Sequence, residues 1–68
     1  MSNWQKVFSD NLEYRAEIVR AVLDDKGLNP VLINKKDSTY HFGQFEVHVE
    51  PSDVLEALKI IRDDIKFG

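Results

Sequence analysis

Residues 11–27, NLEYRAEIVRAVLDDKG, decide the fold, because their spacing predicts an amphipathic helix against which the rest of the chain packs. At 100° per residue, one narrow stripe along this helix carries Leu12, Ala16, Val19 and Leu23. Side chains at these intervals are typical of a helix with one buried face. The remaining sequence is expected to form a small sheet and a second helix that cover this stripe.

Both ends of the predicted helix carry sequence signals. Asp10 is expected to be the N-cap, and Glu13, three residues later, completes a capping-box arrangement that satisfies the first free backbone amides. Gly27 can adopt the left-handed conformation that ends a helix, because glycine has no Cβ and so no steric penalty there. We therefore expect a helix bounded closely by Asp10 and Gly27.

Three stretches predict strands. Residues 4–9, WQKVFS, alternate, with Trp4, Lys6 and Phe8 on one side and the other three residues on the opposite side. The pattern leaves open which side meets the helices. Residues 31–36 follow Pro30, which cannot donate a ladder hydrogen bond, so an edge strand is expected there. Residues 44–50, QFEVHVE, alternate most regularly, with the apolar residues on one buried face.

A second helix is expected to start at residues 51–53, where a proline and an acidic residue suit a first turn. Its predicted buried stripe consists of Val54, Ala57, Leu58, Ile61 and Ile65. Ile60 lies outside this stripe and is available for the seam between the helices or for a partner surface.

The element order predicts an α+β protein, a βαββα arrangement in a single domain over residues 1–68. The economical topology places the third strand at the centre of a three-stranded mixed sheet, order 1-3-2, parallel to the first strand and antiparallel to the second. Both helices then pack on one face, which is a ferredoxin-like fold without its last strand. The open face is expected to carry Gln44, Glu46 and His48 with one side of the first strand.

The composition narrows the functional classes. The chain has 68 residues, a net charge of −3 and no cysteine, so disulfides and thiolate metal sites are excluded. A core this thin favours self-association, and a dimer is the favoured homo-oligomer. The acidic balance disfavours nucleic acid as a partner. No signal-peptide pattern or membrane-length apolar run is present, so we expect a cytoplasmic protein.

The order of short motifs resembles a known family over nearly the whole chain. The motifs are the first strand ending at residues 7–8, the helix start LEYRAE at 12–17, and the helix end L…GL at 23–28. The fourth motif is the C-terminal pattern V-x-V…D…A within residues 47–57. Together they resemble the small prokaryotic signal-transducing protein domain that is related in fold to the PII (nitrogen-regulatory) group. Leu28 departs from the isoleucine that this family usually has.

The resemblance implies a βαββα fold, a bacterial origin and a regulatory role, and no defined chemistry. PII proteins bind nucleotide through a long loop, whereas the corresponding segment here, residues 37–43, is short. Nucleotide sensing therefore does not transfer to this chain, because fold alone does not determine function.

Catalytic and metal-binding patterns are weak. The three glycines are explained by a cap, a turn and a terminus, and no nucleophile, base and orienting group occur together, so we expect no enzyme and no cofactor. His41 and His48, with Glu46 or Asp37, form the one combination suited to a metal. The simpler interpretation is that His41 lies in a loop and His48 on the solvent side of a strand, so no metal site is expected.

Two surfaces are candidates for binding. Positive charge beside stackable rings predicts a ligand or partner edge made of Lys35, Lys36, Tyr40, His41 and Phe42. Apolar residues outside the core stripes, with one strand histidine, predict an association surface made of Trp4, Phe8, Tyr14, Ile18 and His48.

The sequence therefore predicts a small non-enzymatic regulatory or binding module that acts through self-association and through contact with a protein or small ligand. The alternative is a nucleotide or single-stranded nucleic-acid binder that uses the edge at residues 35–43.

Overall fold

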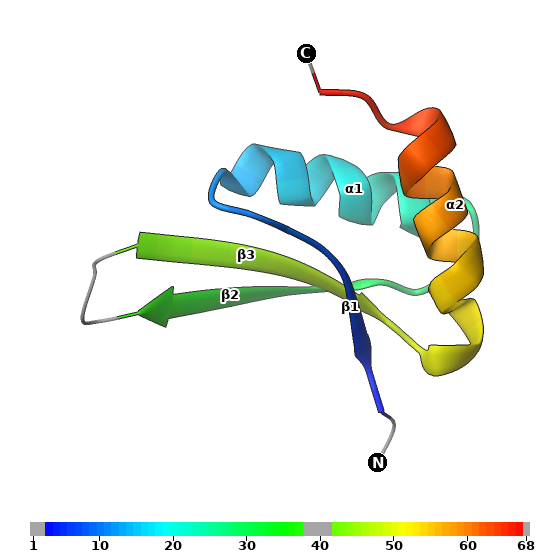
Figure 1. The fold of residues 1–68 in the computed structure, drawn as a ribbon, viewed down its shortest axis with the longest axis horizontal. Coiled ribbons are helices and arrows are strands. Elements are labelled where there is room, and N and C mark those ends of the chain that lie inside the picture. Colours follow the sequence, from blue (N-terminus) through cyan, green and yellow to red (C-terminus); the bar gives the residue numbers. More distant parts are fainter. Residues whose placement is uncertain (1–2, 38–41, 68) are drawn as a thin grey trace.

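A computed structural model describes residues 3–37 and 42–67 of the chain. Its elements in chain order are β1 (Gln5–Asp10), α1 (Glu13–Asp25), β2 (Val31–Asp37), β3 (Phe42–Val49), the 3₁₀ turn η1 (Pro51–Asp53) and α2 (Val54–Asp64). This is the predicted α+β order of strands and helices, and Figure 1 shows it along the chain.

The three strands form a sheet in the predicted order β1-β3-β2, with β2 at an edge. The predicted mixed sheet is wrong, because β3 is antiparallel to both of its neighbours. The crossover through α1 returns β2 in the direction of β1 and leaves room for one strand between them. The β2–β3 hairpin then reverses the chain, so the strand that enters this gap must be antiparallel to both.

The β1–β3 pairing is irregular at Val7. Lys6 pairs with His48 and Phe8 pairs with Val47, so Val7 is an extra residue opposite the central strand. As a result Val7 and Phe8 both pack against the core, while Lys6 lies on the other face with His48. The expected alternation of Lys6 and Phe8 on one side of β1 is therefore wrong.

The N-terminus of α1 differs from the predicted capping box. The helix begins at Glu13 with Leu12 in the N-cap position, and no side chain caps it. Asp10 ends β1, where its Oδ1 accepts a hydrogen bond of 2.8 Å from the backbone N–H of Leu12. Leu12 is 40% exposed because it lies at this turn, so the predicted buried stripe begins at Ala16.

The C-terminus of α1 ends as predicted at a glycine. Gly27 has a φ of 89°, in the left-handed region. Its N–H donates to the carbonyl of Asp24 at 3.0 Å, and the N–H of Leu28 donates to the carbonyl of Leu23 at 3.1 Å. These bonds satisfy helix-end carbonyls and turn the chain so that Leu28 enters the core.

Replacing Gly27 with alanine is expected to lower the free energy of unfolding by about 1 kcal/mol. A Cβ at this position meets no atom within 4 Å, so the loss comes from backbone conformation alone. Urea unfolding of Gly27→Ala measures it. An unchanged transition midpoint would contradict the assigned conformation.

The core is formed where α1 and α2 meet the sheet. Its buried residues are Ala16, Val19, Leu23, Leu28, Val47, Val49, Ala57 and Ile60. The predicted stripe of α2 is wrong in one respect, since Leu58 is 44% exposed and Ile60 is 8% exposed. The reason is the position of α2 at the end of the sheet, which turns Ile60 rather than Leu58 toward the core.

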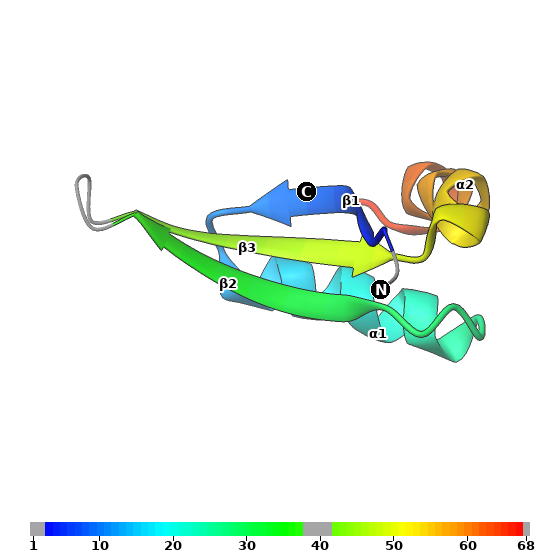
Figure 2. The same cartoon turned by 90° about the horizontal axis from the view of Figure 1, so that it is seen from below.

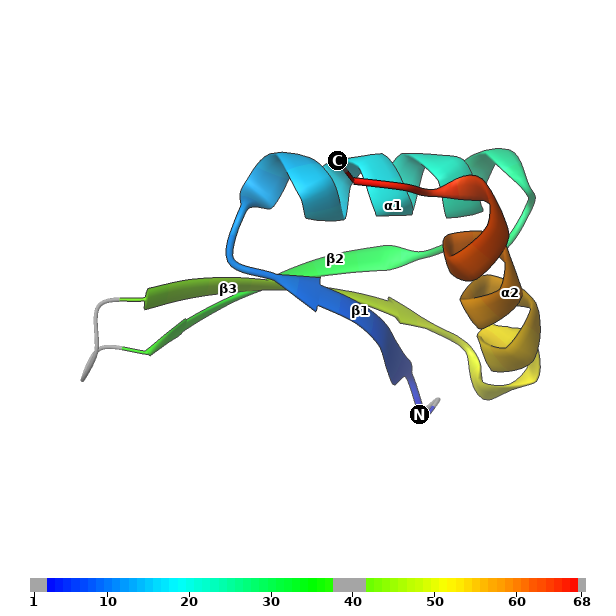
Figure 3. The same cartoon turned by 45° about the horizontal axis from the view of Figure 1, so that its top comes forward.

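The two helices differ in how they cover the sheet. Figures 2 and 3 show α1 lying along one face, and α2 at the end where β1 begins and β3 ends. The C-terminal segment runs back from α2, and Phe67 packs on Phe8 with ring centroids 6.0 Å apart. The face opposite α1 is not covered by any described helix.

Candidate functional site

The face opposite α1 is the open face of the sheet, and the strand register defines its residues. The alternation that directs Phe45, Val47 and Val49 to the core directs their neighbours to the open face. The residues on this face are Lys6 from β1; Val31, Ile33 and Lys35 from β2; and Gln44, Glu46 and His48 from β3. It therefore combines an aliphatic strip on β2 with charged groups from all three strands.

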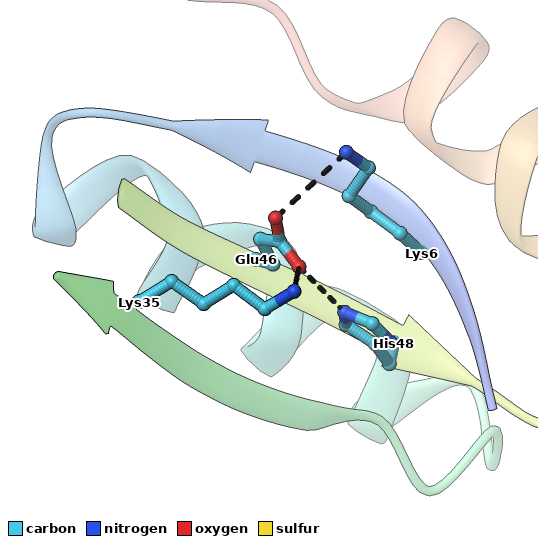
Figure 4. A network of polar contacts seen from close by, with 4 residues as sticks. All are labelled: Lys6, Lys35, Glu46 and His48. Carbon is cyan, nitrogen blue, oxygen red and sulfur yellow. Dashed lines mark hydrogen bonds and ion pairs between the residues drawn. The ribbon is translucent and has the colours of Figure 1, made fainter. Parts of the chain in front are cut away.

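Glu46 lies at the centre of a polar cluster on this face (Figure 4). Its Oε1 contacts Nε2 of His48 at 2.9 Å and Nζ of Lys35 at 3.5 Å. Its Oε2 lies 3.8 Å from Nζ of Lys6. We call Lys6, Lys35, Glu46 and His48 the Glu46 cluster.

The Glu46 cluster encloses its carboxylate and leaves its ammonium groups in solvent. The Glu46 side chain is 8% exposed, whereas those of Lys6 and Lys35 are 51% and 62% exposed. Within the described part of the chain, every buried side-chain nitrogen or oxygen has a hydrogen-bond partner. Each ammonium group has three donors, so both lysines retain donors for a further anion.

The surroundings of Glu46 hold the pKa of its carboxyl below the ordinary value. The hydrogen bond from His48 is the largest cause, and burial opposes it by disfavouring the charged form. The positive charges of Lys35 and Lys6 lower the pKa further. Glu46 is therefore ionised at neutral pH, and it fixes two cations and an imidazole around one point.

The structure describes the side chain of only one of the five residues of the predicted ligand edge. Lys35 is in the Glu46 cluster. Lys36 and Phe42 lie in the backbone ladder, in the pairs Lys36–Gly43 and Asp37–Phe42, and their side chains lie outside the described part. Tyr40 and His41 also lie outside the described residues.

The predicted association surface does not form one patch. Phe8 is half-buried against the core and Phe67, on the face that α1 covers. Tyr14 and Ile18 are exposed on α1, Trp4 is partly exposed just before β1, and His48 belongs to the Glu46 cluster. Association through all five residues at once is not compatible with this arrangement.

The other candidate sites bring together fewer groups that could bind a ligand. A shallow groove of about 280 Å³ lies beside α2 and is lined by Lys26, Glu56, Lys59, Ile60, Asp63 and Asp64. Lys26 and Asp64 pair across it at 3.7 Å. Among the described residues, no three His, Cys, Asp or Glu side chains gather as metal ligands. No helix in the described ranges is long and apolar enough to span a bilayer.

Sequence reasoning placed Glu46 and His48 on one face but did not identify Glu46 as the centre of a cluster. The available signal was the i, i+2 spacing of an acid and a histidine on a regular strand, which brings them within contact distance. Lys6 gave no usable signal, because its side of β1 depends on the irregular residue Val7.

No protein-family model matches the chain, and no significantly similar curated protein or solved structure was found.

Proposed function

We propose that this chain is a small non-catalytic binding module with a regulatory role, and that the open face of its sheet contacts a protein or small ligand. Self-association is part of this proposal. We further propose that the fold is a ferredoxin-like arrangement without its last strand. The order of motifs that resembles the signal-transducing family supports the regulatory role.

One observation carries the proposal, which is the Glu46 cluster at the centre of an uncovered sheet face. Groups from three strands converge there in a fixed geometry, and such preorganisation lowers the entropic cost of binding. The cluster contains two lysines, Lys6 and Lys35, and only one carboxylate, that of Glu46. This excess of positive charge favours a partner that carries an anionic group. The adjoining Val31 and Ile33 offer aliphatic contact to the same partner.

A labelled hexaglutamate peptide is a suitable probe, and fluorescence anisotropy measures its binding. We expect Lys35→Gln to weaken binding by about two- to fivefold, because one exposed ionic contact is worth up to about 1 kcal/mol. The matched control is Lys66→Gln, which removes the same charge from an exposed position after α2. We expect its affinity to equal that of the unmodified chain.

Equal losses in the two variants would contradict the proposal, because binding would then depend on net charge alone. A parallel titration with an oligodeoxythymidylate tests the alternative function. Tighter binding of that probe than of the peptide, lost in Lys35→Gln, would favour nucleic acid as the partner and overturn the preference for a protein or small ligand.

A further inference from the structure

The two edges of the sheet differ in how well they are protected from pairing with another strand. The β1 edge has a register shift at Val7, and Phe67 packs on Phe8 near it. The β2 edge has an unbroken register from Val31–His48 to Asp37–Phe42, and Figure 2 shows no described strand beside it, while α1 lies behind the sheet and projects past this edge near the start of β2. A long and regular edge strand is a template for a further strand.

We propose that β2 pairs with β2 of a second copy of this chain, in antiparallel orientation, and so joins two sheets into one of six strands. This inference rests on the self-association part of the proposed function and names its surface. The partner is a second copy because antiparallel pairing of two β2 strands about Ile33 sets no like charges directly opposite each other and places Lys35 opposite the exposed Val31.

Symmetry limits the register. A two-fold axis perpendicular to the sheet keeps α1 of both copies on the same face, and it must pass through a residue because opposed residues share a face. An axis at Lys35, Lys36 or Asp37 would set like charges directly opposite each other, which is destabilising. An axis at Val31 or Leu32 would pair at most residues 31–33 of the two strands, whereas an axis at Ile33 pairs residues 31–35.

The remaining choices are Ile33 and Asn34. An axis at Asn34 places the two Lys35 residues only two positions out of register, about 7 Å apart along the strands. An axis at Ile33 separates them by four positions, about 13 Å, which is beyond the screening length at physiological salt. It also sets the two Ile33 side chains opposite each other on the open face.

The Ile33 register also covers an exposed apolar side chain. Val31 is 41% exposed, and this register places the partner's Lys35 directly opposite it. The aliphatic stem of a lysine covers such a side chain while its ammonium group stays in solvent. In this dimer the two Glu46 clusters lie on the same continuous face, one on each side of the axis.

Cysteine cross-linking tests the register directly, because the chain contains no cysteine of its own. Opposed Cα atoms in an antiparallel pair are about 4.5–5.5 Å apart, within the range of a disulfide. Under mild oxidation we expect Ile33→Cys to form a covalent dimer. Val31→Cys and Lys35→Cys place their sulfurs about 13 Å from their symmetry mates and are expected to remain monomeric on denaturing gels.

Solution mass provides a second test that does not depend on a cysteine at Ile33. In sedimentation equilibrium from about 1 μM to about 1 mM we expect a reversible dimer. Val31→Lys sets a positive charge opposite the partner's Lys35 and is expected to weaken the dimer about fivefold, whereas Val31→Glu does not weaken it. The control Leu55→Lys, on an exposed part of α2 away from β2, is expected to leave the dimer unchanged.

A monomer at every concentration overturns the inference, and the peptide-binding comparison of Lys35→Gln with Lys66→Gln still stands or fails by itself. A dimer that Val31→Lys leaves intact, or one cross-linked by Asn34→Cys rather than Ile33→Cys, overturns the proposed register.

Discussion

Replacing Leu23 with alanine is expected to lower the free energy of unfolding by about 2–5 kcal/mol. Leu23 is completely buried and lies in one cluster with residues from β3 and α2, so its truncation leaves a cavity between α1, α2 and the sheet. A domain of this length has a small reserve of stability, and the loss is a large part of it.

Thermal unfolding by circular dichroism measures this effect, and we expect the Tm to fall by more than about 10 °C. The matched control is Leu55→Ala, which removes the same atoms from a side chain that is 84% exposed. Its stability is expected to stay within about 0.5 kcal/mol of the unmodified chain. Similar losses in both variants would show that the assigned core is wrong.

Replacing Glu46 with glutamine is expected to lower the free energy of unfolding by about 1–2 kcal/mol at neutral pH. The change keeps the shape of the side chain but removes the charge that holds His48, Lys35 and Lys6. Both lysines are more than half exposed, so solvent screens their share, and the hydrogen bond to His48 carries most of the effect. Glu17→Gln, which breaks an exposed pair with Arg20, is the control and is expected to cost much less.

The Glu46 effect has a defined pH dependence. The pKa of the Glu46 carboxyl is lower in the folded protein than the ordinary value of 4.5, so folding favours its ionised form. The resulting stability is fully present above about pH 4.5 and is lost as the pH falls through the lower folded value. Urea unfolding of the unmodified chain and of Glu46→Gln between about pH 7 and about pH 3 measures this dependence. The difference between their free energies of unfolding is expected to shrink as the pH falls. A gap that stays constant with pH would contradict the assigned charge.

The periodic parts of the sequence predicted the fold well. The alternation in residues 44–50 identified the central strand and its two faces, and Pro30 placed β2 at an edge. Ala16, Val19 and Leu23 lie in the core as their spacing predicted, and Gly27 ends α1. These features depend on local geometry, in which one period or one backbone conformation determines the result.

The errors concern features that local patterns do not determine. The direction of β3 relative to β1 follows from the hairpin topology, and the irregularity at Val7 arises from pairing between distant strands. Ile60 replaces Leu58 in the core because of the rotation of α2, which depends on where that helix docks. Asp10 was expected to cap α1, but it ends β1 because it pairs with the distant strand β3, and its side chain accepts a hydrogen bond from Leu12 in the turn.

Only part of the Glu46 cluster could be predicted, because local patterns determine the position of two of its four residues. Strand alternation placed Glu46 and His48 on the open face, but strand order and register bring Lys6 and Lys35 to them from opposite edges. The position of the two lysines depends on tertiary pairing between strands, and the sequence alone contains no local signal for that pairing.

The measurement that tests the central claim most directly is a map of the hexaglutamate contact by two-dimensional NMR on the uniformly labelled chain. Binding through the open face predicts saturable shifts centred on the amides of Lys6, Lys35, Glu46 and His48, with little change on α2. Shifts centred on α2 or on the groove beside Lys26, with those four amides unmoved, would contradict the account.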